Sequence, residues 1–303
     1  MDTITEAPAY ILPGRLNGHS MGIIIKEMAR RAMESIYRNR VAFQATQKDT
    51  PYKDGGLDFF TNADTEAQQI YLRAIAQSFP TYGVIAEEKD LTIPCTEQDT
   101  DIYFTVDPLD GTKAFIRRQS HGIGTMISLV QDGVIIAACV GDVMTGEFYY
   151  YRPGSDKVHR NNWRDNSTGE LSIVTRPLAS QYVLLGDDPR NMSLIVQKLT
   201  DPTRKPKVFK DIEVMSGSIG TKLARLWKGE VAAYIIKAGA CTPWDWNPVA
   251  GISGKLGFVA VTRHRRKWAS FPFNPLKRVG RIESDTIIVH QSNVEELMSH
   301  LLP

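Results

Sequence analysis

Two carboxylates lie three residues apart in the stretch Asp107-Pro108-Leu109-Asp110-Gly111-Thr112. Oxygen ligands of this kind suit Mg²⁺, which binds through a few carboxylates and bridges to phosphate groups. Gly111 permits a sharp turn and a close approach of the backbone to a ligand. Thr112 then begins a predicted short helix, whose first N–H groups could hold a phosphate. The same pattern is also typical of an ordinary surface turn, so the motif alone leaves both interpretations open.

The elements before this central motif are predicted to position its carboxylates. The apolar, β-branched run 102–106 indicates a buried strand, which Pro108 is expected to end. A second short apolar strand at 83–86 is followed directly by the pair Glu87-Glu88, and then by a charged loop at 89–101. Adjacent glutamates usually form a solvated pair. At the end of a buried strand, however, one of them can face the same site as the motif.

Two amphipathic helices precede these strands. Apolar residues recur at helical spacing from Ser20 to Arg38 and again from Asp64 to Ile75. The polar segment 47–57 contains a proline and two glycines and indicates a loop, and residues 1–17 are expected to form a poorly ordered arm. Asp64 falls in the first turn of the second helix, where the helix dipole favours an acidic residue whatever else that residue does.

The chain is predicted to form two lobes. A segment at 152–170, rich in Asn, Asp, Arg, Gly and Ser, separates a meander of strands from a second alternation of strands and helices. We therefore divide the chain into residues 1–160 and 161–303. In the second part, Pro248 is expected in the first turn of a helix. The other predicted elements of this part are strands at 182–185, 231–236, 258–261 and 286–289 and helices at 192–199, at 218–228 and from Ser292 onward.

Composition narrows the class of partner. The 303 residues are 42% hydrophobic and carry a net charge of +2, which gives no field that favours nucleic acid or a membrane. The three cysteines are odd in number and far apart, as is typical of a reducing compartment. No uncharged run approaches the length of a membrane span. We expect a cytoplasmic protein whose partner is a small molecule.

Four motifs, in this order, resemble those of the inositol monophosphatase superfamily of Mg²⁺-dependent and often lithium-sensitive phosphatases. They are Thr61-Asn62-Ala63-Asp64, Glu87-Glu88, the central motif and Trp244-Asp245. Several weak motifs in a fixed order are much more specific than any one of them. The resemblance implies an α/β (α+β) fold, a layered αβαβα sandwich of the inositol monophosphatase and fructose-bisphosphatase type, and a homodimer.

The resemblance also implies a set of ligands for two or three Mg²⁺ ions. Asp107 has two oxygens and would bridge two ions. Glu87 and the carbonyl of Leu109 would complete the first site, and Asp110 with Asp245 the second. Two metal ions about 4 Å apart can both activate a water and relieve the charge on phosphoryl oxygens.

Two further groups complete the implied site. Thr112 would orient the attacking water, while Asp64 would support that water or a third, weaker ion. The N–H groups of Gly111 and Thr112 would hold the phosphate. The last motif can be aligned in two ways, because Trp246-Asn247 matches the family's tryptophan-aspartate pair as an alternative to Trp244-Asp245. We prefer Asp245 to Asn247 as the ligand, since a carboxylate offsets the charge of Mg²⁺ and an amide does not.

Two lysines indicate what kind of phosphate ester the site would accept. Lys113 follows the central motif, where bisphosphate nucleotidases resemble this chain more than inositol phosphatases do. Lys237 is the one charged residue between Ile235 and Trp244, and a cation there suits a second phosphate better than a polyol. The sequence therefore predicts a phosphomonoesterase for an anionic ester such as 3′-phosphoadenosine 5′-phosphate. The alternatives are inositol, histidinol or sugar phosphates, and a metal-binding scaffold without turnover.

Overall fold

The structure is a computed structural model of the chain. It describes residue 12 and residues 16–48, 58–264, 267–270, 274, 275, 277 and 279–301. Most of the predicted arm at 1–17 and of the predicted loop at 47–57 lies outside the described residues.

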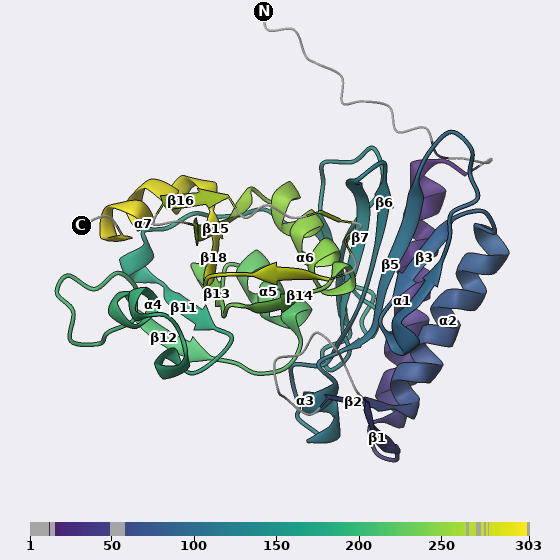
Figure 1. Cartoon of the computed structure of the whole chain (residues 1–303), viewed down its shortest axis with the longest axis horizontal. Helices are drawn as coiled ribbons and strands as arrows, with labels where there is room; N and C mark the ends of the chain where they lie inside the picture. The colour runs from purple at the N-terminus through teal and green to yellow at the C-terminus, as the bar shows by residue number, and fades with distance from the viewer. Residues whose placement is uncertain are drawn as a thin grey trace, which may run out of the picture.

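Five layers stack across the molecule in the order helices, sheet, helices, sheet, helices (Figure 1). Helices α1 (Gly18–Asn39) and α2 (Asn62–Ser78) cover the outer face of an eight-stranded sheet. Between this sheet and a six-stranded sheet lie α5 (Ile219–Trp227) and α6 (Pro243–Lys255). The far face of the six-stranded sheet carries α4 (Leu194–Leu199) and α7 (Val294–Leu301). This confirms the αβαβα sandwich.

The eight-stranded sheet has the strand order β10-β9-β8-β7-β6-β5-β3-β4. Strands β3 and β5 run parallel, so their carboxyl ends lie at the same edge, and β5 pairs antiparallel with β6. The sheet continues past the predicted lobe boundary at 160/161, so the division into two lobes stays a prediction. The bounds are β3 Gly83–Ala86, β4 Leu91–Ile93, β5 Ile102–Asp110, β6 Gly124–Gln131, β7 Val134–Asp142, β8 Glu147–Tyr151, β9 His159–Asn162 and β10 Thr168–Glu170.

The six-stranded sheet has the order β12-β11-β13-β18-β15-β16. Strand β11 runs parallel to both β12 and β13, whereas the other pairs are antiparallel. Two small sheets, β1-β2 and β14-β17, lie beside the main ones. The bounds are β1 Ala45–Lys48, β2 Asp58–Thr61, β11 Tyr182–Leu185, β12 Asp211–Val214, β13 Ala233–Ile236, β14 Gly239–Cys241, β15 Phe258–His264, β16 Lys267–Ser270, β17 Gly280–Ile282 and β18 Thr286–His290.

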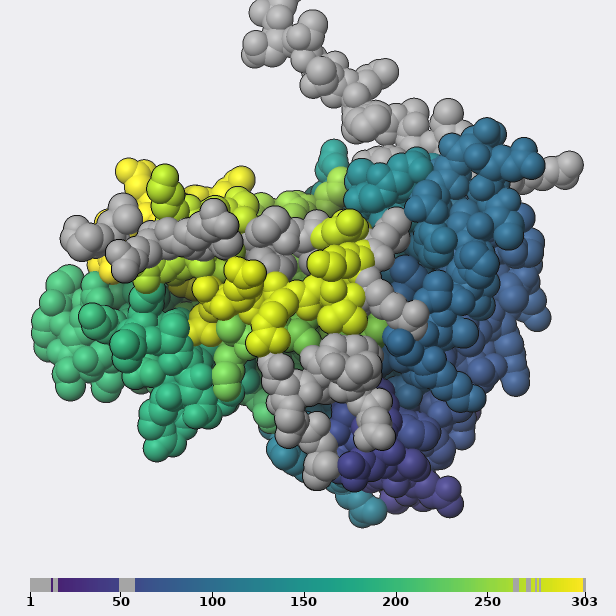
Figure 2. Space-filling model, in the orientation of Figure 1, coloured from purple at the N-terminus to yellow at the C-terminus, as the bar shows by residue number. Residues whose placement is uncertain are grey.

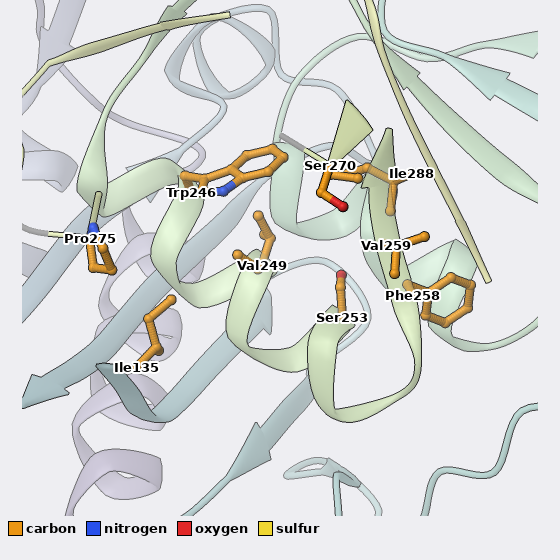
Figure 3. Close-up of a pocket in the computed structure, with 11 residues that line it drawn as sticks. Ile135, Trp246, Val249, Ser253, Phe258, Val259, Ser270, Pro275 and Ile288 are labelled. Atoms are coloured by element: carbon orange, nitrogen blue, oxygen red, sulfur yellow. The ribbon is translucent and has the colours of Figure 1, made fainter. Parts of the chain in front are cut away.

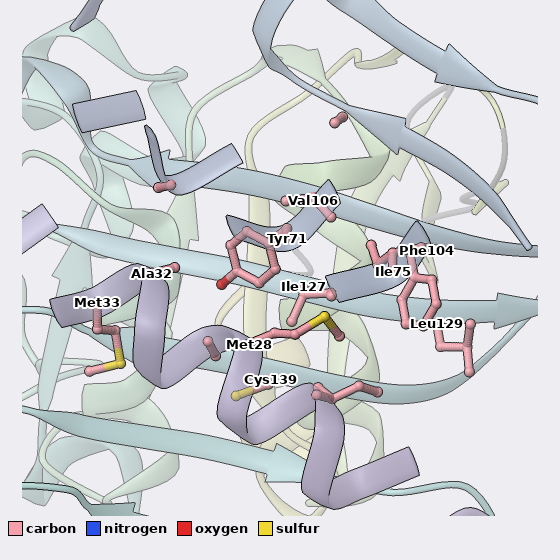
Figure 4. Close-up of a cluster of buried hydrophobic side chains, with 14 of the residues drawn as sticks. Met28, Ala32, Met33, Tyr71, Ile75, Phe104, Val106, Ile127, Leu129 and Cys139 are labelled. Carbon is pink, nitrogen blue, oxygen red and sulfur yellow. The ribbon is translucent and has the colours of Figure 1, made fainter. Parts of the chain in front are cut away.

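Apolar side chains at helical and strand periods explain how these layers pack. On α1, Met28 and Met33 are fully or almost fully buried, and they meet Tyr71 of α2 and strand residues such as Ile127 (Figure 4). A second cluster of buried apolar side chains fills the space around α5 and α6, and a third joins the six-stranded sheet to α4 and α7. Removing this much apolar surface from water is the main force that holds the layers together.

The structure corrects three local predictions. Pro108 does not end its strand, because β5 continues to Asp110 through a bulge. A short 3₁₀ turn (Glu88–Asp90) and β4 occupy part of the predicted loop at 89–101. Pro248 lies in the interior of α6, which begins at Pro243. Pro243 takes the first helical position, where a missing N–H has no cost, and burial of Pro248 in the packed helix outweighs its lost hydrogen bond.

Candidate active site

A cleft of about 560 Å³ gathers side chains from segments far apart in the sequence. The first half of the chain forms the right side of the molecule and the second half the left side (Figure 2), and the cleft takes residues from both. Sequence-predicted residues make up much of its wall. The described lining residues are Asp58, Glu87, Asp107, Leu109, Asp110, Gly111, Thr112, Lys113, Gly217, Lys237, Ala238, Gly239, Ala240, Thr242, Trp244 and Asp245.

A β-bulge shapes the central motif. Asp107 pairs with Met126 and Asp110 pairs with Gly124, so β5 carries one residue more than β6 over this interval. Pro108 lies inside the bulge, where a strand can do without one of its N–H donors. Gly111 follows with a φ of 94°, a left-handed conformation that favours glycine.

The bulge brings Asp107 and Asp110 close to Asp245 of α6. One carboxylate oxygen from each of the three lies within 4.8 Å of the other two. Asp245 stands in the first turn of its helix, and its Oδ2 accepts a hydrogen bond of 2.6 Å from Thr242 Oγ1. The structure therefore joins three of the predicted metal ligands, contributed by both halves of the chain, in one cluster.

Asp107 is the most constrained member of this cluster. Its side chain is only 2% exposed, and its Oδ1 accepts no hydrogen bond from any described residue. Burial, together with the carboxylates of Glu87, Asp110 and Asp245, raises the pKa of Asp107 well above its usual range. A buried carboxylate beside other carboxylates is costly unless a cation offsets the charge. The donor set is all oxygen, which suits a hard divalent cation such as Mg²⁺.

Asp110 is held by the start of α5. Its two oxygens accept hydrogen bonds from Ser218 Oγ and from the N–H groups of Ile219 and Gly220. Burial raises the pKa of Asp110, although these hydrogen bonds and the positive charge of Lys222 act in the opposite direction. Sequence reasoning did not predict this contact, because the partners are more than a hundred residues apart.

Asp64 lies behind the cleft rather than in its wall. It is fully buried, and its Oδ2 accepts hydrogen bonds from the N–H (2.7 Å) and the hydroxyl (2.6 Å) of Thr61, forming a capping box at the start of α2. Its Oδ1 is 3.1 Å from Thr112 Oγ1, which also lies 3.2 Å from the Leu109 carbonyl oxygen. Burial raises the pKa of Asp64 to about 6. Asp64 thus reaches the cleft through Thr112.

Lys48 of β1 is a site residue that sequence reasoning missed. Its Nζ lies 3.0 Å from Glu87 Oε1 and 2.7 Å from Glu88 Oε1. Burial alone would lower the pKa of Lys48, but the charges of Glu87 and Glu88 raise it overall. Burial also raises the pKa of Glu88 to about 7. Only Glu87 of the pair lines the cleft, and a lone lysine in a polar strand carries no sequence signal of such a contact.

The two predicted substrate lysines also line the cleft. Lys113 belongs to the short helix α3 (Thr112–Ile116), and Lys237 follows β13 directly. Lys237 is not free: its Nζ lies 2.9 Å from Asp187 Oδ2, in a pair whose side chains are 44% and 36% exposed. This pair lowers the pKa of Asp187.

Asn247, the alternative to Asp245, takes a structural position. Its side chain is fully buried, and its Nδ2 donates to the Pro275 carbonyl at 2.8 Å and more weakly to Thr105 Oγ1 at 3.4 Å. It is absent from the lining of the cleft among the described residues. Asp245 is therefore the residue that α6 presents to the carboxylate cluster.

A second hollow, of about 310 Å³, lies along α6 and β15. Trp246, Val249 and Phe258 are among the residues that surround it (Figure 3). Its described lining contains no titratable side chain, so it offers no group for acid–base or metal chemistry. The cleft with the carboxylate cluster is the candidate active site.

The sequence pattern of the inositol monophosphatase family matches residues 19–297, and the chain therefore belongs to this family of metal-dependent phosphatases. The family resemblance read from the four motifs is thus confirmed. Within the part of the chain that the structure describes, no helix is long and apolar enough to cross a bilayer.

Curated relatives place the chain near two branches of the family. Nus factor SuhB of Vibrio cholerae is 34% identical over 140 residues, which is 45% of this chain and 49% of that protein. The match thus spans about half the length of this relative. Human 3′(2′),5′-bisphosphate nucleotidase 1 is 24% identical over 218 residues, which is 64% of this chain and 68% of that protein.

Solved structures share the fold at low sequence identity. A staphylococcal IMPase-I complexed with products has a TM-score of 0.68 at 18% identity and covers 95% of this chain and 96% of its own. An IMPase/NADP phosphatase complexed with Mg²⁺ and phosphate has a TM-score of 0.67 at 19% identity, with 94% and 95% covered. These similarities establish the fold.

Proposed function

We propose that this chain is a Mg²⁺-dependent phosphomonoesterase that hydrolyses a small phosphate ester carrying a second anionic group, such as 3′-phosphoadenosine 5′-phosphate. The observation that carries the proposal is the cluster of Asp107, Asp110 and Asp245, in which Asp107 Oδ1 has no donor among the described residues. Burying several ionised carboxylates together is costly, and bound cations offset that cost. Membership of a phosphatase family gives the cluster its chemistry.

The ligand roles are those that the family resemblance implies, and all five residues concerned line the cleft. Asp107 would serve both ions. Glu87 and the Leu109 carbonyl would share the first ion, and Asp110 and Asp245 the second. Bound Mg²⁺ would lower the pKa of a water and relieve charge on the phosphoryl oxygens.

Thr112 and Asp64 would fix the direction of the attacking water. The Thr112 hydroxyl has two acceptors within reach, Asp64 Oδ1 and the Leu109 carbonyl, so its proton points into the protein. Its own oxygen is then left as an acceptor for a water in the cleft. With a pKa of about 6, Asp64 is mostly ionised at neutral pH and keeps the Thr112 proton turned inward.

The start of α3 would hold the phosphate. The first N–H groups of a helix have no partner within the helix, and Gly111 and Thr112 both line the cleft. A Cβ atom on Gly111 would lie 2.2 Å from the Gly122 carbonyl oxygen. No other residue fits this turn without moving the backbone, which keeps the two amides at the cleft.

The two lysines of the cleft lining support a doubly anionic substrate. Lys113 and Lys237 both line the cleft, and the wall segment from Lys237 to Ala240 contains no acidic residue. The relative named 3′(2′),5′-bisphosphate nucleotidase and a structural neighbour complexed with NADP favour a nucleotide with an additional phosphate.

The test is phosphate release by the purified chain with Mg²⁺ or with EDTA. The substrates are 3′-phosphoadenosine 5′-phosphate, NADP, inositol 1-phosphate, histidinol phosphate and a sugar phosphate. We expect activity with Mg²⁺, loss in EDTA, inhibition by Ca²⁺ and Li⁺, and the highest kcat/KM for a doubly anionic nucleotide. A higher kcat/KM for inositol 1-phosphate would replace the nucleotide assignment. Metal binding without phosphate release from any substrate would indicate a scaffold.

A further inference from the structure

Three hydrogen-bond donors hold the carboxylate of Asp110, a member of the proposed metal site. Its Oδ2 accepts from Ser218 Oγ at 2.5 Å and from Gly220 N at 2.8 Å, and its Oδ1 accepts from Ile219 N at 3.1 Å. All three donors belong to the first turn of α5 and its capping residue. This turn comes from the second half of the chain, whereas Asp110 ends a strand of the first half.

Ser218 is built into this junction. Its side chain is fully buried, and its hydroxyl oxygen also accepts from Thr221 N at 2.9 Å, which caps α5. Its own N–H donates to the Gly122 carbonyl at 2.9 Å. Because its oxygen is engaged by Thr221 N, the single Ser218 proton is directed at Asp110. The hydroxyl therefore acts on both the helix and the carboxylate.

Counting lone pairs shows what these bonds leave free. An ionised carboxylate has about four acceptor positions, two on each oxygen. Ser218 Oγ and Gly220 N fill both positions on Oδ2, and Ile219 N fills one on Oδ1. One position on Oδ1 remains, and one Asp110 oxygen lies within 4.8 Å of oxygens of Asp107 and Asp245.

We propose that Ser218 is a positioning residue that holds Asp110 so that it binds a metal ion through one oxygen, Oδ1. Without the hydroxyl, Oδ2 has one donor fewer and the carboxylate can rotate about its last bond. Polar groups behind metal ligands typically change metal affinity by about 10–100-fold when they are removed. The inference rests on the metal site proposed above and adds a residue that does not line the cleft among the described residues.

The test measures metal binding without substrate, on the purified full chain. Free Mn²⁺ is followed by electron paramagnetic resonance, because Mn²⁺ takes the same oxygen ligands as Mg²⁺. We expect Ser218→Ala to weaken Mn²⁺ binding about tenfold and to raise the Mg²⁺ concentration for half-maximal activity by a similar factor. The KM for the phosphate ester at saturating Mg²⁺ should stay within about twofold of wild type, since Ser218 acts through Asp110 and not on the substrate.

Matched variants separate this role from helix capping. Ser193 caps α4 with its side chain in the same way, 3.5 Å from Val196 N, and does not line the cleft. Ser193→Ala should lower the melting temperature without changing Mn²⁺ affinity. Ser218→Gly removes the hydroxyl but keeps a good capping residue, so it serves if Ser218→Ala fails to fold. Ser218→Thr, which keeps the hydroxyl, should recover part of the lost affinity.

Two outcomes would overturn the inference. If wild type binds Mn²⁺ and both Ser218→Ala and Ser218→Gly bind it equally well, Ser218 only caps α5, and the metal site itself stands. If wild type binds no divalent cation, the metal site and the positioning role fail together.

Discussion

Two groups of charged residues in the cleft lining differ in how far water reaches them. Asp107 and Asp110 are 2% and 7% exposed and lie among other carboxylates. Lys237 pairs with Asp187 at 2.9 Å, and both side chains of this pair are more than a third exposed. Electrostatic interactions are strong between buried charges and weak where water screens them. We therefore expect the buried acidic cluster to bind ions firmly, and the exposed lysines to change substrate affinity only modestly.

The largest effect is expected in the buried acidic cluster. Asp107→Asn should abolish turnover, because in the proposed function this one residue serves both metal ions, while the substitution leaves the volume almost unchanged. The same change removes a charge that repels Glu87, Asp110 and Asp245. We therefore expect the metal-free variant to melt at a higher temperature than metal-free wild type.

Steady-state phosphate release and thermal melting in EDTA check this pair of effects. Asp142→Asn is a control, since Asp142 is a half-buried aspartate that accepts hydrogen bonds from Met144 N and Thr145 N and is not among the described residues that line the cleft. It should keep activity. Near-wild-type turnover of Asp107→Asn at saturating Mg²⁺ would contradict the two-metal assignment.

The next largest effect is expected from one of two adjacent glutamates, Glu87 and Glu88, which both form ion pairs with Lys48. Glu87 lines the cleft, whereas Glu88 is buried beside it and exchanges hydrogen bonds with Gln68 through its backbone. Glu87→Gln should lower kcat by about a hundredfold, the usual cost of removing a key electrostatic group. Glu88→Gln should lower kcat much less. Equal losses in the two variants, measured at saturating Mg²⁺, would show that Lys48 and not the Glu87 carboxylate governs activity.

The raised pKa values of buried carboxyl groups predict how the stability of the metal-free protein depends on pH. The pKa of Asp64 is about 6 and that of Glu88 about 7 in the folded protein, against about 4 in an unfolded chain. The folded state then binds more protons in this interval, so its stability is greatest below about pH 4 for these groups and falls as pH rises through about 6 to 7. Carboxylates with a lowered pKa, such as Glu27 at about 2, lose their contribution only at lower pH.

Melting temperatures in EDTA at about pH 5 and about pH 8 measure this dependence. We expect a drop of a few degrees toward about pH 8, a smaller drop in Glu88→Gln, and recovery on adding Mg²⁺. A metal-free protein that became more stable over this interval would contradict the buried like-charge arrangement.

The smallest effects are expected from the exposed lysines of the cleft lining. Lys237→Ala and Lys113→Ala should raise the KM for 3′-phosphoadenosine 5′-phosphate about two- to tenfold, in keeping with the modest energy of exposed ion pairs. The KM for a phosphate ester with a neutral remainder should change less. Asp187→Asn sharpens the comparison, because it releases Lys237 and should lower the KM for the doubly anionic substrate.

Lys157→Ala provides the control for this series. Lys157 is also an exposed lysine in an ion pair, with Glu170 at 2.7 Å, but it does not line the cleft among the described residues. It should leave every KM unchanged. If Asp187→Asn raised the KM of the nucleotide instead, Lys237 would depend on Asp187 for its position and not be restrained by it.

Sequence reasoning succeeded for residues and helices that a short motif or a local periodicity identifies. Asp107, Asp110 and Gly111 belong to one short motif, and α1 and α2 follow from helical periodicity. Predictions failed where tertiary packing accommodated a proline at a position that the local rules for proline exclude. Pro108 is a strand breaker by rule, yet a bulge in β5 accommodates it. Pro248 was expected in the first turn of a helix, but Pro243 holds that position.

The sequence by itself thus determined the family, the layered fold and the acidic residues, because motif order and hydrophobic period are properties of nearby residues. Only the tertiary structure decided which distant groups meet those acids. Lys48 reaches Glu87 across 39 positions, and Ser218 reaches Asp110 across 108. Contacts at such separation depend on how strands and helices pack. The sequence around a single lysine or serine does not predict which distant residue it will contact. The same packing paired Lys237 with Asp187, so the tertiary structure sets how much positive charge Lys237 presents to the cleft.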